Sequence, residues 1–281
     1  MKRVLLAVSI GIVVLALAPK TASADMCSGT YEEIVDCLNE KLEYVEITTD
    51  DDGNPLVVVT GANVRISNAS SGDGTGNLIV GNGHTWTGST NGFIAGRYNT
   101  ITGASPVVSG GQLNVADGNY SSVSGGYDNR ASGLYATVSG GRGNTVLGNM
   151  SSISGGHGNL ISAGQRYSMI SGGRENTIHA DNASISGGNK NIASGNHSFI
   201  GGGYSNQAFA RWSSITGGRD NETEAAGEYS SITGGRNNKN GGWFAVIGGG
   251  QSNMAHGPYS MIAGGWSNET TEVADWSSVS G

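Results

Sequence analysis

A repeat of about 15 residues covers most of this chain and limits its fold more than any other feature. The repeat can be aligned on a branched apolar residue, here called the anchor, that is followed two places later by glycine. The anchors are Ile79, Ile94, Val108, Val123, Val138, Ile153, Ile170, Ile185, Ile200, Ile215, Ile232, Ile247, Ile262 and Val279. Most spacings are 15 residues, one is 14, and the three that end at Ile170, Ile232 and Val279 are 17. Such a period indicates a solenoid in which each repeat forms one coil.

Apolar and small residues alternate around each anchor. A Ser or Ala stands two places before it in every coil from Ser121 to Ser277, and glycine stands two places after it. A period of two is typical of a strand with one face buried. A second inward position lies further along each coil, at Ala116, Ala131, Val146, Ile161, Ile178, Ala193, Ala208 and Ala255, with Thr223, Asn240 and Thr270 as departures. Each coil is therefore predicted to hold two short strands joined by two tight corners.

An asparagine recurs at the sixth place of the repeat, counted from the anchor. It is Asn114, Asn129, Asn144, Asn159, Asn176, Asn191, Asn206, Asn221, Asn238, Asn253 and Asn268. The two extra residues of each long coil fall after this Asn, so we expect them to lengthen one corner only. We expect Gly-Gly and Asn to form the corners, because both tolerate positive φ, and the stacked Asn side chains to share hydrogen bonds along the axis. Thirteen steps of about 4.8 Å predict a rod roughly 60 Å long.

The chain is thus predicted to be all-β: a parallel β-roll or β-solenoid over 79–281, which ends within a repeat, preceded by a short helix and a β-hairpin over 25–78. Residues 1–24 have the pattern of a secretory signal peptide, with Lys2 and Arg3, an apolar run over 4–18 and Ala22-Ser23-Ala24 as the cleavage site. No other apolar run approaches the 18 residues of a membrane span. We therefore expect a secreted or cell-surface protein.

The segment between signal and repeats is predicted to cap the first coil. Residues 28–43 have a helical apolar pattern, and Tyr44 to Thr48 and Leu56 to Thr60 form a predicted hairpin around Asp50 to Asn54. That acidic turn lacks the closing Glu of a calcium loop. Cys27 and Cys37 are the only cysteines. In an exported protein they predict one disulfide, with two free thiols as the alternative.

Charge and histidine placement argue against several functions. Without Lys2, Arg3 and Lys20 the chain has 12 basic and 22 acidic residues, a net charge of −10. This disfavours nucleic acid and anionic lipid as partners. The histidines are scattered at 84, 157, 179, 197 and 256, without metal-ligand spacing or a nucleophile partner. We predict no enzyme activity, no metal and no cofactor.

Two columns of side chains are candidates for binding. The first, the aromatic stripe, lies three places before the anchor and comprises Tyr120, Tyr135, Tyr167, Trp212, Tyr229, Phe244, Tyr259 and Trp276. It could bind sugar rings or protein partners, or form a ladder that shields one corner or joins subunits. The second lies four places after the anchor and includes Arg142, Arg174, Arg219 and Arg236 with Tyr127, His157, Tyr204 and Trp266. Arg at such a corner can stack on an aromatic ring, and the column is either a site for an anionic glycan or a solvated edge.

The units Ser122-Val123-Ser124-Gly125-Gly126-Tyr127-Asp128-Asn129-Arg130-Ala131-Ser132-Gly133 and Ile185-Ser186-Gly187-Gly188-Asn189-Lys190-Asn191-Ile192-Ala193-Ser194-Gly195 resemble head repeats of YadA-like trimeric autotransporter adhesins. The resemblance implies a left-handed parallel β-roll, a homotrimer, display at the bacterial outer membrane and cell adhesion to a host matrix protein or glycan. The family's coil is slightly shorter, with Ser or Ala in place of this Asn. Its members end in a coiled-coil stalk and a membrane-anchor barrel, whereas this sequence stops inside a repeat, so we expect either a fragment or a protein released without that anchor.

Two other interpretations stay open. One is a structural surface filament without a ligand. The other is ice binding, because Asn99-Thr-Ile-Thr-Gly103 is similar to plant ice-binding β-rolls. An ice-binding face needs a regular hydroxyl array, but hydroxyls flank the anchor on both sides in only seven of the twelve coils from Val108 onward. The leading prediction is an extracellular adhesive or structural module that is not catalytic.

Overall fold

The computed structural model describes residues 3–9, 12–18, 45–49, 55–59, 76–273 and 275–281. The chain divides into two compact units, Met1–Arg65 and Ile66–Gly281. The predicted helix over 28–43, the Cys27–Cys37 disulfide and the turn over 50–54 lie outside the described residues. No helix within those ranges is long and apolar enough to cross a membrane.

The first unit contains two antiparallel strand pairs. Strand β1 (Arg3–Ser9) pairs with β2 (Ile12–Ala18) inside the predicted signal peptide, which itself stays a prediction. Strand β3 (Val45–Thr49) pairs with β4 (Pro55–Val59), with Thr49 opposite Pro55. The predicted hairpin is confirmed, with strand ends shifted by one residue.

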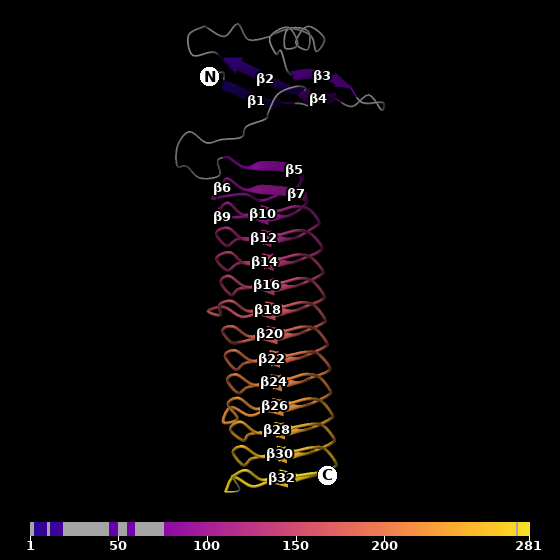
Figure 1. Ribbon diagram of the computed structural model, residues 1–281. Coiled ribbons are helices and arrows are strands. Elements are labelled where there is room, and N and C mark those ends of the chain that lie inside the picture. Colours follow the sequence, from indigo (N-terminus) through magenta and orange to yellow (C-terminus); the bar gives the residue numbers. More distant parts are fainter. Residues whose placement is uncertain (1–2, 10–11, 19–44, 50–54, 60–75, 274) are drawn as a thin grey trace. The chain divides into compact units, whose positions relative to one another are not determined.

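The second unit is a parallel β-solenoid built from two long sheets (Figure 1). The fourteen-stranded sheet carries the anchors and consists of β5 (Leu78–Asn82), β7 (Phe93–Arg97), β10 (Val107–Val108), β12 (Ser122–Val123), β14 (Thr137–Val138), β16 (Ser152–Ile153), β18 (Met169–Ile170), β20 (Ser184–Ile185), β22 (Phe199–Ile200), β24 (Ser214–Ile215), β26 (Ser231–Ile232), β28 (Val246–Ile247), β30 (Met261–Ile262) and β32 (Ser278–Val279). The predicted fold class and period are confirmed.

The twelve-stranded sheet carries the second inward position. It consists of β8 (Thr100–Ile101), β11 (Val115–Ala116), β13 (Arg130–Ala131), β15 (Thr145–Val146), β17 (Leu160–Ile161), β19 (Thr177–Ile178), β21 (Ile192–Ala193), β23 (Gln207–Ala208), β25 (Glu222–Thr223), β27 (Lys239–Asn240), β29 (Met254–Ala255) and β31 (Glu269–Thr270). A short parallel pair, β6 (Ser89–Thr90) with β9 (Gly103–Ala104), lies in the first coils.

Each strand pairs with the equivalent strand one coil further along, residue for residue. Ile185 lies opposite Ile200, and Ala193 lies opposite Ala208. The long coils keep this register, since Ile153 pairs with Ile170 across a 17-residue interval. The extra residues lengthen a corner and leave the strands in place, as predicted.

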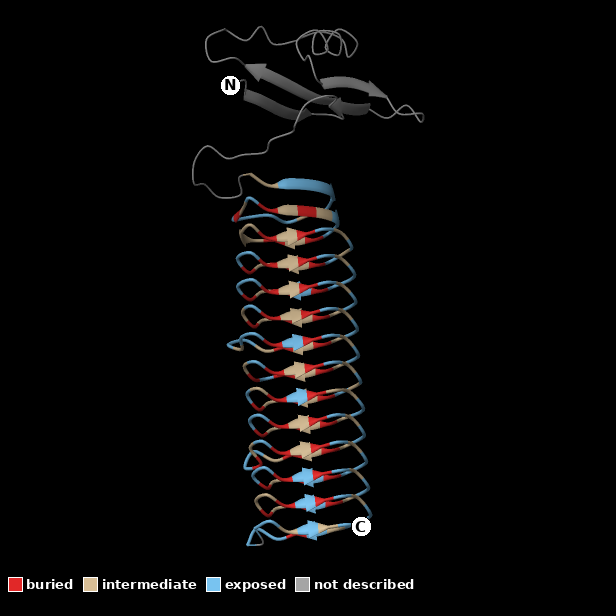
Figure 2. Ribbon diagram, viewed as in Figure 1, coloured by how far each residue is buried: buried red, intermediate tan, exposed pale blue. Residues whose placement is uncertain are grey.

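The core is one thin column of small and branched side chains between the two sheets. Figure 2 colours buried residues red, and they recur in coil after coil along the roll. Every anchor from Ile94 to Ile262 is fully buried, as are the second inward positions. Two polar departures are paired inside the core: Thr223 Oγ1 lies 2.8 Å from Ser213 Oγ, and Thr270 Oγ1 donates to Ser260 Oγ at 3.0 Å. At the third, Asn240 Nδ2 donates to the Ala245 carbonyl at 2.9 Å. These partners offset most of the desolvation cost of the two hydroxyls and of Asn240 Nδ2, whereas Asn240 Oδ1 is buried without a partner among the described residues.

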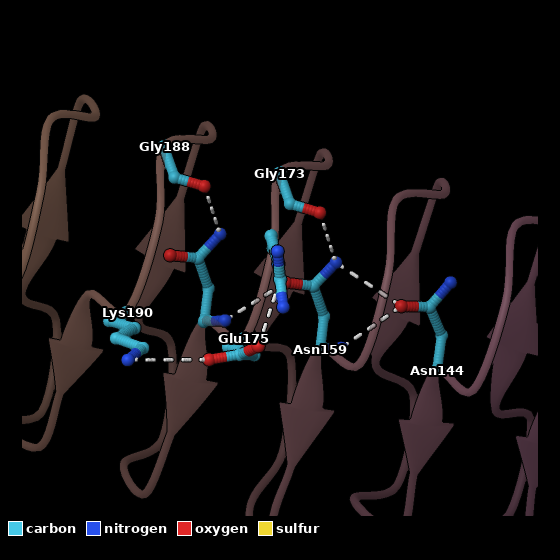
Figure 3. Close-up of polar contacts among 8 residues, drawn as sticks. Asn144, Asn159, Gly173, Glu175, Gly188 and Lys190 are labelled. Carbon is cyan, nitrogen blue, oxygen red and sulfur yellow. Dashed lines mark hydrogen bonds and ion pairs between the residues drawn. The ribbon is translucent and has the colours of Figure 1, made fainter.

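The Asn side chains form a continuous ladder, and Figure 3 shows part of it. The ladder also includes Asn99, whose Oδ1 accepts a hydrogen bond from the Asn114 N–H. The Asn176 backbone N–H donates to Asn159 Oδ1 at 3.0 Å, while Asn176 Nδ2 donates to the carbonyls of Gly172 at 3.0 Å and Gly188 at 3.1 Å. The expected bonding along the axis is present, but it joins side chain to backbone. One side-chain pair, Asn159 with Asn144 at 3.2 Å, is of the expected kind. Each Asn therefore connects three successive coils.

The prediction that the Asn takes positive φ was wrong. The left-handed residues at this corner are the second glycine and the residue before the Asn, such as Gly188 at φ 83° and Lys190 at φ 59°. The ladder explains the difference, because the Asn side chain must reach inward to two glycine carbonyls. The left-handed conformation that turns the chain is therefore taken by the residue before the Asn. The glycine is required by space as well. A Cβ on Gly188 would lie 2.3 Å from the Gly203 carbonyl oxygen.

Candidate functional site

The aromatic stripe runs along the corner that leads from the twelve-stranded sheet back to the fourteen-stranded sheet. Seven of its eight predicted members are 41–75% exposed, and Tyr259 is half-buried. His197 takes the stripe position of its coil, as the sequence indicates, and Met150 and Asn182 have the same left-handed backbone. The stripe is thus a surface feature, interrupted in the middle of the roll.

Rings of neighbouring coils stack face to face at the C-terminal end of the stripe. His197, Trp212, Tyr229, Phe244, Tyr259 and Trp276 form one series with successive centroid distances of 3.7, 6.2, 4.6, 5.6 and 4.5 Å and planes within 6° of parallel. Trp243 packs its edge against Phe244 and Tyr259 at 4.6 and 5.1 Å. We call Trp212, Tyr229, Trp243, Phe244, Tyr259 and Trp276 the aromatic patch. Tyr120 and Tyr135 form a separate stacked pair at 4.9 Å.

Every aromatic residue of the stripe adopts a left-handed backbone, with φ between 54° and 62°. This conformation costs a bulky L-residue about 1 kcal/mol or more, and glycine or asparagine adopts it at lower cost. An aromatic pair contributes about 0.5–1.5 kcal/mol beyond its buried area. Stacking therefore does little more than offset the strain. Stability alone would be served as well by smaller residues, so the exposed rings favour a role at the surface.

The stacking also decides which part of each ring a partner can reach. Inside the series both faces of Tyr229, Phe244 and Tyr259 are covered by neighbouring rings. Trp243 meets Phe244 and Tyr259 in a T-shaped contact, so a partner can reach only those ring edges that neighbouring rings leave uncovered. Ring edges with polar groups suit a protein surface better than a sugar, which stacks on a ring face.

The second column extends further than the sequence analysis proposed. Consecutive members are joined by parallel bridges between coils, and all twelve end in a planar group. They are Arg97, Gln112, Tyr127, Arg142, His157, Arg174, Asn189, Tyr204, Arg219, Arg236, Gln251 and Trp266. We call this set the planar column. The guanidinium carbons of Arg142 and Arg219 lie 5.3 Å from the ring centroids of Tyr127 and Tyr204, which confirms the predicted stacking of Arg on aromatic rings.

The outward face of the fourteen-stranded sheet carries no charged side chain beside its anchors, and the one charged residue of its strands is Arg97 at the end of β7. Two residues per coil point outward there, one on each side of the anchor, from Leu78 to Ser280, and each is apolar, Gly, Ser or Thr. Met169, Phe199 and Met261 are exposed on it. The outward positions of the twelve-stranded sheet, by contrast, carry Asp117, Arg130, Glu222, Glu224, Lys239 and Glu269. An uncharged, low-relief face about 60 Å long marks a surface suited to contact with another protein surface.

A second, shorter polar ladder lies beside the stripe and was not predicted from the sequence. Asn119 Oδ1 accepts from the Ala104 N–H, Asn149 Oδ1 from the Leu134 N–H, and Asp181 Oδ1 from the Arg166 N–H, at 2.9, 2.9 and 2.7 Å. All three residues lie two places before a small inward residue. The residue type at that position differs from coil to coil, so these hydrogen bonds become evident only in the folded structure.

Within the described ranges no group of three or more His, Cys, Asp or Glu is placed to hold a metal ion. Cys27 and Cys37 lie outside these ranges. The scattered histidines stay apart in the fold, with His157 in the planar column and His197 in the stripe. No family model matches the chain, and a search of the curated proteins found no match.

Proposed function

We propose that this chain is an extracellular, non-catalytic adhesive rod. The observation that carries the proposal is the aromatic patch, whose rings remain about half-exposed on backbone that other residue types adopt at lower cost. Large, rigid aromatic side chains dominate protein-binding surfaces because they contribute much contact area at low entropic cost. The resemblance of the repeats to YadA-like head repeats supports the same function.

The proposal includes assembly as a homotrimer through the uncharged face of the fourteen-stranded sheet. A face about 60 Å long and three residues, roughly 10 Å, wide offers on the order of 600 Å² per copy. Specific interfaces bury about 600–1,000 Å² per partner, so the whole face reaches the lower end of that range. Three rolls whose uncharged faces turn inward would leave the stripe and the planar column toward solvent.

Attachment of purified protein to surfaces coated with collagen, fibronectin or mucin tests the proposal. The variant Tyr229→Ser/Phe244→Ser/Tyr259→Ser should lose attachment while its circular dichroism stays native. Each aromatic anchor contributes on the order of 2 kcal/mol, so three reduce affinity by about four orders of magnitude. The matched control is Tyr120→Ser/Tyr135→Ser/Tyr167→Ser, which makes the same substitutions on the same left-handed backbone outside the patch and should keep attachment.

Other results would favour the rival functions. If the patch variant loses its fold or its oligomeric state together with attachment, the stripe is a structural ladder in a filament without a ligand. If wild-type protein attaches to none of the three surfaces, the adhesive proposal is wrong.

Ice binding is the second candidate, and the flat uncharged face with its hydroxyl pairs, such as Ser122 and Ser124, is the one observation that favours it. Exposed Met169, Phe199 and Met261 interrupt that array. Thermal hysteresis of a protein solution would decide for ice binding, and we expect none.

A further inference from the structure

The planar column is the most uniform surface feature of the roll. Its twelve members include five Arg and no Asp, Glu or aliphatic residue. Ten are exposed, and Gln112 and Asn189 are half-buried. Because the members are bridged coil to coil, their side chains leave the surface at the strand spacing of about 4.8 Å. The column is therefore a straight series of hydrogen-bond donors parallel to the roll axis.

Charge is segregated toward this column. Residues 76–281 contain 10 basic and 11 acidic residues, so the roll is close to neutral and the acidic excess of the chain belongs to residues 25–75. We group the planar column with the residue that directly precedes the Asn in each coil. This group holds six of the basic residues, namely the five Arg of the column and Lys190, and three of the acidic ones, Asp128, Glu175 and Asp220. The rest of the roll holds four basic and eight acidic residues. One edge is thus net positive on a chain of net negative charge.

Stacking orients part of this positive charge. Arg142 and Arg219 lie over Tyr rings of the preceding coil, which fixes the plane of the guanidinium group. A guanidinium held by its face keeps its N–H edge free to donate two parallel hydrogen bonds to a carboxylate or sulfate. The side chains are ordered before a ligand arrives, which lowers the entropic cost of binding.

Several of these arginines have their charge available. Within the described residues Arg142 and Arg236 form no ion pair. Arg174 pairs with Glu175 at 2.8 Å and Arg219 with Asp220 at 3.0 Å, but these side chains are exposed. Glu175 also pairs with Lys190 (Figure 3). Exposed pairs contribute little, so an anionic ligand can replace them.

We propose that the planar column binds a linear anionic polysaccharide, aligned with the roll axis, through bidentate contacts from its arginines. An extended polysaccharide presents acidic groups at intervals of one or two sugars, close to the spacing of one or two coils. This proposal rests on the proposed adhesive function and names a class of ligand for it. The planar column and the aromatic patch are, however, different surfaces.

A single-stranded nucleic acid is the less favoured polyanion. Proteins bind it by stacking bases on bare aromatic faces along a positive groove. In the planar column Arg142 and Arg219 cover ring faces of Tyr127 and Tyr204. The column therefore offers charged edges more than stacking platforms.

The experiment measures the Kd of full-length secreted protein for heparin, polygalacturonate, neutral dextran and oligo-dT at several salt concentrations. Wild-type protein should bind at least one of the two anionic polysaccharides, bind oligo-dT more weakly and not bind dextran. The variant Arg142→Gln/Arg236→Gln should raise the Kd at least about tenfold and reduce the slope of log Kd against log salt by about two. The control Arg166→Gln/Arg211→Gln makes the same charge change outside the column and should stay within about twofold.

The variant Arg142→Lys/Arg236→Lys separates planar recognition from charge. It should weaken binding about threefold, because Lys cannot donate two parallel bonds. If the Gln variant fails to fold, the Lys variant still tests whether these arginines bind the polysaccharide. Equal losses in the Gln variant and its control, or unchanged affinity in the Lys variant, would overturn the assignment to the column. Tighter binding of oligo-dT, or no binding of either anionic polysaccharide, would overturn the ligand class. The aromatic patch variant should keep its polysaccharide affinity, so failure of one proposal is distinguishable from failure of the other.

Discussion

Removal of one Asn from the ladder should destabilise the roll more than removal of any exposed polar residue. Asn191 is fully buried, and its Nδ2 donates to the carbonyls of Gly187 at 3.0 Å and Gly203 at 3.2 Å. Its Oδ1 accepts from the Asn206 N–H at 2.9 Å. Asn191→Ala removes the two hydrogen bonds from Nδ2, of about 1 kcal/mol each, and leaves the buried Asn206 N–H without its partner at a cost of about 1–3 kcal/mol. We expect a loss of about 4 kcal/mol.

Urea unfolding followed by circular dichroism at fixed protomer concentration measures this loss, since association shifts apparent stability. Hydrogen exchange of the Asn206 amide reports the same event locally and should accelerate strongly. The control Asn196→Ala removes an exposed side chain that accepts one bond, from the Asp181 N–H at 3.3 Å, and should cost less than about 1 kcal/mol. Equal effects of the two variants would refute the role assigned to the ladder.

Asn191→Asp adds a test by pH. The introduced carboxyl keeps one acceptor for the Asn206 N–H but turns its second oxygen toward two carbonyls, so burial raises its pKa in the folded state above the unfolded value of about 3.9. A raised folded pKa means that stability is lost as pH rises above the unfolded value. The variant should therefore be least stable at neutral pH and recover toward pH 4, where the protonated carboxyl donates to a carbonyl. A flat pH profile relative to wild type would contradict the geometry.

Two further substitutions test the corner and the core. Gly188→Ala places a Cβ 2.3 Å from the Gly203 carbonyl oxygen on a residue with φ 83°, and it should destabilise the roll by more than about 2 kcal/mol. The control is the adjacent Gly187→Ala, whose Cβ meets nothing within 4 Å. Thermal melts should show that this control is nearly neutral. Ile185→Asp buries an unpaired charge at a fully buried anchor and should unfold neighbouring coils, whereas Ser194→Asp on an outward position should not; an unchanged melting curve for Ile185→Asp would refute the strand register.

The repeat was enough to predict the strands and the core, because a period-two pattern with one inward face leaves a single register for each coil. Ile185 and Ala193 lie inside as predicted, and so does the polar departure Thr223. The partners of the polar residues were not predictable. Whether Asn176 bonds to another side chain or to Gly188 depends on where the corner turns, and the turn is set by the residue before the Asn.

The functional surfaces were predicted only in part. The stripe was visible as a column of aromatic letters, but its left-handed backbone, which makes the choice of Tyr229 or Trp212 costly, is a property of the folded corner. Stacking of Arg on aromatic rings was predicted for this column, whereas Arg97, which lies three places after its anchor, joined the planar column only when the coils were aligned in space. The scarcity of charge on the fourteen-stranded sheet belongs to a whole face, and it became evident when residues of separate coils, such as Ser122, Met169 and Phe199, were placed on that face.

The proposed function requires that the chain acts through its outer faces as an assembly of copies. Sedimentation equilibrium of the purified protein tests this most directly. The test variant is Ser184→Lys/Ser214→Lys on the uncharged face, and the control is Thr145→Lys/Thr177→Lys on the outward face of the twelve-stranded sheet. We predict three chains for wild type and for the control, and a folded monomer for the Ser184→Lys/Ser214→Lys variant, because a buried unpaired charge opposes contact between copies. A wild-type protein that sediments as a monomer at every concentration would contradict the account.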